Sequence, residues 1–212
     1  MSDYIYNSRF SFLARCWWQG SGKRIEPQAW DSATEHLAPI WVQFNGNDRW
    51  NRYLLAEPDG VLEKSLSPLD YDNPKHTYCE LFWFGAYQRG SYQHGEQCYY
   101  EIRPVDRAWM RHPWVVDYNS SFLSGYVGIW GADEKAAALR KPAGSRLWTL
   151  NGLDHEALKR GTRRCNLEWV SASGSKVRRY QTDGISALNI ISGEEGLLAL
   201  EVLAIPYEFG EI

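Results

Sequence analysis

The sequence lacks any long apolar run: no stretch of its 212 residues approaches the ~18–20 apolar residues that span a bilayer. Its first residues, MSDYIYNSRF, also lack a basic region followed by an apolar one, the pattern of a secretory signal. We therefore expect a cytoplasmic protein, in the producing cell or in a host cell, with no membrane partner.

Sulfur-containing residues are few, with four cysteines and two methionines. The cysteines are scattered, and none forms a CxxC pair; they are Cys16, Cys79, Cys98 and Cys165. In a reducing compartment such cysteines are free and mostly buried thiols. The sequence indicates no disulfide framework, and we expect no cofactor.

One spacing is similar to that of a small structural zinc site: HxxC, then HxxxC, formed by His76, Cys79, His94 and Cys98. The same region is typical of a hairpin, which would leave His94 in the loop and Cys79 ~30 Å down a strand, at ~3.3 Å per residue. Because four ligands must meet at one ion, the hairpin and the zinc site exclude each other. We favour the hairpin and expect no metal.

Catalytic signatures are missing as well. No serine lies in a GxSxG motif, and no second histidine follows His155 and Glu156 at HExxH spacing. GSGK at 20–23 lacks the preceding glycine of a phosphate loop, and Arg24 stands in place of its hydroxyl residue. Because these three catalytic or phosphate-binding motifs are missing, the sequence favours a protein without catalysis.

Aromatic residues are abundant instead: 11 Trp, 13 Tyr and 7 Phe make up 15% of the chain. Aromatic side chains suit pleated sheets, so the composition favours strands. We expect one globular domain over 1–212 of the α+β class, rich in antiparallel sheet and either sandwich-like or strongly curved. Two or three short helices are expected, at 26–39, 132–141 and 153–161, with a long irregular connection over 57–76.

Alternation and turn signals place the strands. The expected strand segments are 4–18, 40–44, 49–57, 113–120 and 122–131. Towards the C-terminus, 165–173 and 176–182 are expected to form a hairpin around a Gly-Ser turn. A closing hairpin is expected around Gly193 and Gly196.

Residues 77–103 are predicted to form a hairpin whose loop centres near Ser91. This register gives one apolar face, which we expect in the core: Cys79, Leu81, Trp83, Cys98, Tyr100 and Ile102. The opposite face mixes charge with rings: Glu80, Phe82, Phe84, Tyr99, Glu101 and Arg103. It is either a partly covered sheet face or an exposed platform for bases, sugars or a partner's side chains, and the first reading is favoured.

Charge is unevenly distributed along the chain. Residues 135–180 hold eleven basic residues against three acidic ones, a net charge of +8 in a chain of net charge −3. Such asymmetry points to an anionic partner, or else to a patch that acidic neighbours offset in the fold. The candidate docking residues are the basic and aromatic ones of this segment: Arg160, Arg163, Arg164, Arg178, Arg179, Tyr180, Trp148 and Trp169.

Three functions remain open. We favour a non-catalytic binding protein of the inhibitor, immunity or assembly type, bacterial or phage, which holds an acidic protein or nucleic acid through an aromatic and basic surface. The second is an enzyme acting on nucleic acid or a nucleotide, with acid–base groups drawn from His155, His112, Tyr180 and Glu168. The third is a carbohydrate-binding module, which the missing signal sequence disfavours.

Overall fold

Antiparallel strands dominate the structure, a computed structural model that describes residues 4–20, 24–33, 36–44, 52–57, 77–91, 93–105, 114–119, 124–131 and 146–206. The strands are Tyr4–Tyr6 (β1), Phe12–Gly20 (β2), Leu37–Phe44 (β3), Leu54–Ala56 (β4), Thr77–Cys79 (β5), Leu81–Arg89 (β6), Tyr99–Pro104 (β7), Trp114–Tyr118 (β8), Val127–Gly131 (β9), Trp148–Asn151 (β10), Arg163–Val170 (β11), Arg178–Thr182 (β12), Ile185–Asn189 (β13) and Glu194–Ala204 (β14). Short 3₁₀ turns occur at Ser8–Phe10 (η1), Pro27–Ser32 (η2) and His155–Ala157 (η4).

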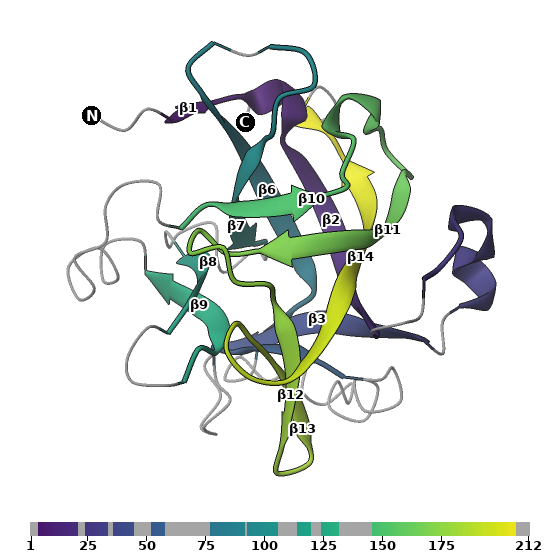
Figure 1. Cartoon of the computed structure of the whole chain (residues 1–212), viewed down its shortest axis with the longest axis vertical. Coiled ribbons are helices and arrows are strands. Elements are labelled where there is room, and N and C mark those ends of the chain that lie inside the picture. Colours follow the sequence, from purple (N-terminus) through teal and green to yellow (C-terminus); the bar gives the residue numbers. More distant parts are fainter. Residues whose placement is uncertain are drawn as a thin grey trace.

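The strand pairings close into two rings. In the first ring, β2, β6, β7, β10, β11 and β14 pair in that circular order, and every pairing is antiparallel. In the second ring the order is β2, β3, β4, β13, β12 and β14. Both rings therefore share the β2–β14 pair, which crosses the middle of the molecule in Figure 1. The β8–β9 pair lies outside the rings and bridges to the second one through Tyr53 and Tyr126.

Alternation along β2 builds the core. Phe12, Ala14, Cys16 and Trp18 are all buried, because successive side chains of a strand point to opposite faces. A single cluster of buried residues runs from these positions into both rings. This main core lies between the walls of the sheet, and smaller buried clusters lie beside it around Trp30 and around Trp41.

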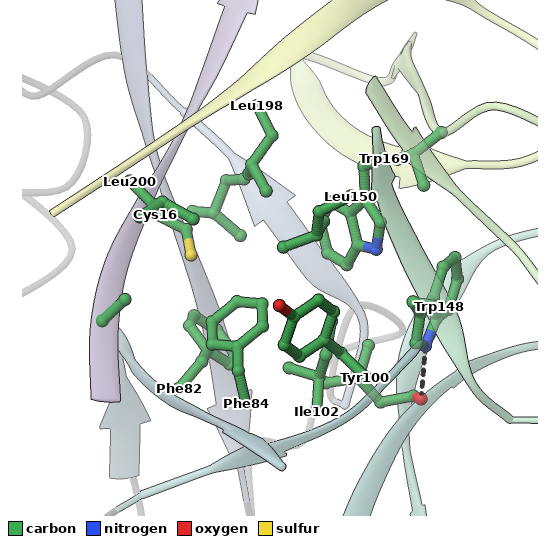
Figure 2. Packing of buried hydrophobic residues seen from close by; sticks show 14 of the residues in the cluster. Cys16, Phe82, Phe84, Tyr100, Ile102, Trp148, Leu150, Trp169, Leu198 and Leu200 are labelled. Atoms are coloured by element: carbon green, nitrogen blue, oxygen red, sulfur yellow. Dashed lines mark hydrogen bonds between the residues drawn. The ribbon is translucent and has the colours of Figure 1, made fainter. Parts of the chain in front are cut away.

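Aromatic rings fill much of that core in the first ring, as Figure 2 shows. Phe12 and Phe84 stack with centroids 4.7 Å apart, and Tyr100 meets both rings edge-on. The Trp148 indole N–H donates a hydrogen bond to the Val116 carbonyl oxygen at 3.0 Å, which links β10 to β8.

The large antiparallel sheet confirms the expected β-rich architecture, but the expected helices are wrong where the structure describes them. Segment 26–39 forms only the turn η2 and then enters β3, and segment 153–161 forms only η4. Both stretches are too short to offset the cost of helix nucleation in a chain whose neighbours pair as strands. Segment 132–141 and residues 58–76 of the long connection lie outside the described residues.

A hairpin forms within 77–103, between β6 and β7, but residues 77–79 pair with β3 instead and the predicted register is wrong. Trp83, not Glu80, lies opposite Arg103, and Tyr87 lies opposite Tyr99. The difference of three residues is odd, so every side chain of β6 changes face while those of β7 do not. Phe82 is consequently buried and Trp83 faces outward. The polar loop is centred two residues later than the sequence pattern indicated.

The C-terminal strands are also connected differently from the prediction. No hairpin forms around Gly193 and Gly196, because β12 lies between β13 and β14. The tight turn is instead Asp183–Gly184, where both residues have positive φ, 49° and 79°. Asp-Gly is a strong signal for a hairpin turn of this kind, and it joins β12 to β13. The hairpin expected from 165–173 and 176–182 is also shorter than predicted: it is limited to an isolated bridge between Val170 and Lys176, beside the Gly-Ser turn.

The shared strand pair has no room for a side chain at Gly196. A Cβ atom there would collide with the Trp18 indole and the Gln19 carbonyl oxygen, whereas at Gly20, its partner in the pair, the nearest atom would be Glu194 Oε1 at 3.9 Å. We expect Gly196→Ala to destabilise the protein by about 1–3 kcal/mol through overpacking. Urea unfolding monitored by tryptophan fluorescence measures this, with Gly20→Ala as the matched control; equal midpoints for the two variants would contradict the fold described.

Candidate functional site

Arg163 belongs to an ion-paired cluster rather than to an open basic surface. Its Nη1 lies 2.6 Å from Asp31 Oδ1, and its Nε lies 3.1 Å from Glu201 Oε1. The guanidinium also lies 5.6 Å from the centre of the Trp30 ring. Hydrogen bonds to Glu201 and Asp31 raise the pKa of Arg163. Its positive charge is therefore balanced from two other parts of the chain.

The second basic run is balanced across strands. Arg178 pairs with Glu195 at 2.6 Å and Arg179 with Glu194 at 3.2 Å, following the register of β12 and β14. Lys176 pairs with Glu168 at 2.6 Å. Four of the eleven basic residues of 135–180 thus face carboxylates in the fold: Arg163, Lys176, Arg178 and Arg179.

The remaining candidate residues are dispersed. Trp148 and Trp169 are buried, with ring centroids 5.3 Å apart, so their rings lie in the core rather than on the surface. Tyr180 lies against Tyr126 at 6.1 Å, in a different aromatic cluster. Arg160 is exposed in the turn before β11. Arg164 is half-buried and donates to the Arg163 carbonyl oxygen at 3.2 Å.

The residues with zinc-like spacing have separate surroundings. The Cys79 thiol faces the carbonyl oxygens of Leu81 and Val105, and His94 Nδ1 lies 2.6 Å from Glu156. His76 lies outside the described residues, which contain no cluster of three metal-ligating side chains. Burial raises the pKa of the Cys98 thiol to about 11, so it is protonated at neutral pH.

The candidate acid–base residues each have their own partners. His155 packs on Phe10 with ring centres 4.6 Å apart, and its burial lowers its pKa. Glu168 binds Lys176, whose hydrogen bond lowers the pKa of the carboxyl group. Tyr180 joins the aromatic cluster described above, and His112 lies outside the described residues. This arrangement gives no support to a shared catalytic centre.

A different set of rings forms a continuous outer surface. These five residues face away from the core on three adjacent strands, β6 and β7 of the first ring and β1, which pairs with β6. We call them the Tyr–Trp surface: Tyr4 and Tyr6 on β1, Trp83 and Tyr87 on β6, and Tyr99 on β7. Their neighbours along each strand point inward or to the opposite side, so alternation alone collects the rings. Tyr6 is 49% exposed, and Ile5 beside it is 57% exposed.

Two ring contacts join β1 to β7 and to β6 on the Tyr–Trp surface. Tyr4 meets Tyr99 at 5.1 Å, and Tyr6 meets Tyr87 at 5.5 Å, both edge-on. Tyr87 and Tyr99 are opposite one another in the β6–β7 register. Gly85 leaves room for Trp83 and Tyr6 to approach each other over the backbone of β6.

Charged groups border the same surface. The Arg89 guanidinium donates two hydrogen bonds to the Tyr4 hydroxyl, at 3.0 and 2.8 Å, and lies 5.2 Å from that ring and 5.6 Å from the Tyr99 ring. Further along, Arg103 pairs with Glu101. Burial and the Glu101 carboxylate raise the pKa of Tyr87, so its hydroxyl stays protonated and neutral.

Sequence reasoning singled out the correct stretch but missed the residues that form this surface. It placed Trp83 in the core and Phe82 outside, the reverse of the structure. Tyr4 and Tyr6 were part of an expected strand, and nothing in their local pattern revealed that β1 pairs with β6. The only usable signal was the density of tyrosine and tryptophan in both segments.

No protein-family model matches the sequence, and no match was found among curated proteins or solved structures. None of the helical segments in the described residues has the length and apolarity that a bilayer crossing requires. The assignment of a function therefore depends on the surface and its chemistry.

The ion-paired arginines should behave as structural residues. Combining Arg163→Ala, Arg178→Ala and Arg179→Ala removes four ion pairs, each worth about 0.2–1 kcal/mol, together with the Arg163 packing on Trp30. We expect a fall in melting temperature of several degrees in calorimetry. Arg160→Ala, at an exposed arginine, serves as the control and should leave the melting temperature unchanged. Equal melting temperatures for the triple variant and the wild type would contradict this view.

Glu57 offers a test by pH. The side chain is buried; burial raises its pKa above the ordinary 4.5, and the Ser186 N–H and the charge of Arg179 partly oppose that rise. A raised folded-state pKa means that stability is lost as pH rises through it. Glu57→Gln, which is neutral at every pH, should therefore be more stable than the wild type at about pH 7.5, with the difference closing near pH 4. Urea midpoints at both pH values measure this, and Glu194→Gln, at an exposed carboxylate, should show no such gain.

Proposed function

We propose that the protein is a non-catalytic binding protein that docks a protein partner on the Tyr–Trp surface. This keeps the expected class, an inhibitor, immunity or assembly protein of the cytoplasm, but moves the binding surface from 135–180 to β1, β6 and β7. The observation that carries the proposal is the set of five rings on an outer sheet face, four of them in two edge-on pairs, with Tyr6 49% exposed.

Composition supports a protein partner. Tyr, Trp and Arg are enriched at the energetic centres of protein interfaces, and Lys is depleted. The residues of this face follow that bias: five tyrosines or tryptophans are bordered by Arg15, Arg89 and Arg103, and no lysine lies on β1, β6 or β7. Two of these arginines form pairs with glutamates, which lowers the net positive charge available to a polyanion.

The nucleic-acid alternative has less support. A phosphate-binding surface needs cations that can exchange counterions for phosphates, whereas Arg163, Arg178 and Arg179 each have a carboxylate partner. A labelled oligonucleotide titrated at about 50 mM and about 200 mM salt tests this branch. We expect no binding at the lower salt; tight binding that weakens steeply at the higher salt would favour nucleic acid instead.

The proposal itself is tested by site-specific photo-crosslinking in the producing cell, with the crosslinking residue at Tyr6 or, as a control, at the exposed Gln181. The partner captured only at position 6 is then purified and titrated. We expect Tyr6→Ala and Trp83→Ala to weaken its binding at least tenfold while circular dichroism shows an unchanged fold. Tyr180→Ala and Arg160→Ala, on the surface first expected from the sequence, should bind like the wild type.

The two sets of variants separate the two surfaces. If Tyr180→Ala and Arg160→Ala abolish binding and Tyr6→Ala does not, the basic segment is the docking site and the proposal is wrong. The proposal would also be overturned if position 6 captured no protein while position 181 still gave crosslinks in its usual yield.

A further inference from the structure

The strand β1 is an edge strand whose outer side is open at Tyr6. Within the described residues β1 pairs with β6 and with no other strand. The Asn7 N–H donates to the Ala86 carbonyl oxygen at 2.8 Å, which continues the ladder between the two strands. Because hydrogen-bonded and non-hydrogen-bonded positions alternate in an antiparallel pair, the main-chain groups of Tyr6 point away from β6. No described residue hydrogen-bonds to them, so they offer one donor and one acceptor to an added strand.

The side chains at this edge are apolar and exposed on both faces of the strand. Ile5 is 57% exposed and Tyr6 is 49% exposed, and they point to opposite faces. In the part of the chain that the structure describes, Ile191 is the one other large apolar side chain that is exposed. Edge strands are commonly protected from pairing by lysine, proline, other charges or a bulge. Residues 4–6, Tyr-Ile-Tyr, have none of these features and favour a strand.

A row of tyrosines on the Tyr–Trp surface ends at the same edge. Tyr99 lies opposite Tyr87 in the β6–β7 register, and Tyr87 lies opposite Tyr6 in the β1–β6 register. Directly opposed side chains on one face of a sheet pack against each other. Tyr99 and Tyr87 are half-buried within the row, whereas Tyr6 at its end is exposed. A strand added beside β1 would supply the next side chain of the row and cover Tyr6.

A second copy of the chain fits this edge less well than a different protein. Two β1 strands that paired antiparallel about a two-fold axis would form one sheet, with the axis perpendicular to it. Both Tyr–Trp surfaces would then face the same side, and neither would cover the other. The strand also has only three residues, whereas a stable interface buries at least ~1,200 Å² in total. A separate partner can pair with the edge and also cover the adjoining rings.

Resting on the function proposed above, we infer that the partner docks by adding an extended strand to the outer edge of β1. Its backbone pairs with the N–H and the carbonyl oxygen of Tyr6, and its side chains alternate with the same two-residue period as those of β1. One of them lies beside Tyr6 and the next beside Ile5, on the other face. Because both faces are apolar at this edge, the segment has β-branched or aromatic residues at consecutive positions, and no proline opposite Tyr6.

The test begins with selection of a random octapeptide phage library on the full-length protein, with counter-selection on Tyr6→Pro. Proline removes the outward N–H and is tolerated in an edge strand where that N–H is unpaired, so circular dichroism should show an unchanged fold. We expect selected peptides with consecutive Val, Ile, Tyr or Phe residues. Labelled synthetic copies, titrated by fluorescence polarisation, should bind Tyr6→Pro at least tenfold more weakly than Tyr6→Phe, which keeps the ring and the N–H.

A backbone scan of the peptide then tests for ladder pairing. Methylating one peptide nitrogen at a time removes one donor, and in a paired strand only alternate N–H groups face the neighbouring strand. We expect at least tenfold losses of affinity at every second position and small changes at the positions between. Ile5→Lys places a charge at the edge and should weaken binding at least tenfold. Ile191→Lys, at the other exposed isoleucine, is the matched control and should bind like the wild type.

Three results would overturn the inference. Methylation that weakens binding equally at all positions, or at none, would show that side chains alone hold the ligand, and the crosslinking at position 6 would decide separately whether a partner docks there. Selection of no peptide that is sensitive to both Tyr6→Pro and Ile5→Lys would reject pairing at this edge. A wild-type dimer in sedimentation that Ile5→Lys dissociates would assign the edge to a second copy. If Tyr6→Pro unfolds the protein, Ile5→Lys replaces it in the counter-selection.

Discussion

The pairing of β2 with β14 is the constraint on which the rest of the structure depends. It joins residues 13–20 to residues 196–204, near opposite ends of the chain, and both rings of strands close through it. Its outer side is covered by Trp30 of η2 and by Ala33, the residue after η2, which pack on Ala199. Asn166, at an irregularity in β11, binds the Gln19 side chain and the Ile25 backbone, and so fastens the neighbouring strand to the same pair. Contacts so distant in sequence are costly to form, because the loop-closure entropy must be spent before they stabilise anything.

Closure of the first ring also accounts for the aromatic outer surface. A closed sheet has one inside, and each strand sends alternate residues there. Phe82 and Phe84 of β6 fill that interior, which leaves Trp83 and Tyr87 of the same strand on the outer face. A sequence with aromatic residues at consecutive positions must therefore place rings on both sides of the wall. Only one side is needed for stability, and the other is available for a partner.

The parts that could be predicted from the sequence are those that depend on local chemistry. Alternation and turn residues located most strands, including β3, β8 and β9, because each signal lies within a few residues. Register could not be predicted in this way, since the 90–98 loop sets which residue of β6 faces Tyr100, and one odd shift reverses a whole strand. The Asp183–Gly184 turn has a recognisable local signal, but the glycines at 193 and 196 gave a second turn signal nearby, and the hairpin was predicted there instead. Apart from hairpins such as β6–β7, the pairing partners of the strands could not be predicted from local patterns.

Charged side chains can be neutralised within a fold, whereas exposed aromatic side chains must be covered. This difference distinguishes the two candidate sites, the basic segment 135–180 and the Tyr–Trp surface. A run of basic residues can be neutralised within the chain, as Glu194 and Glu195 on β14 neutralise Arg179 and Arg178 on β12, because register alone brings the opposite charges together. Once paired, such residues contribute modestly to stability and have little charge left for a ligand. Exposed rings have no comparable internal remedy: an apolar surface can be removed from water only by covering it. The proposed docking therefore rests on the exposed rings around Tyr6 rather than on the larger accumulation of charge.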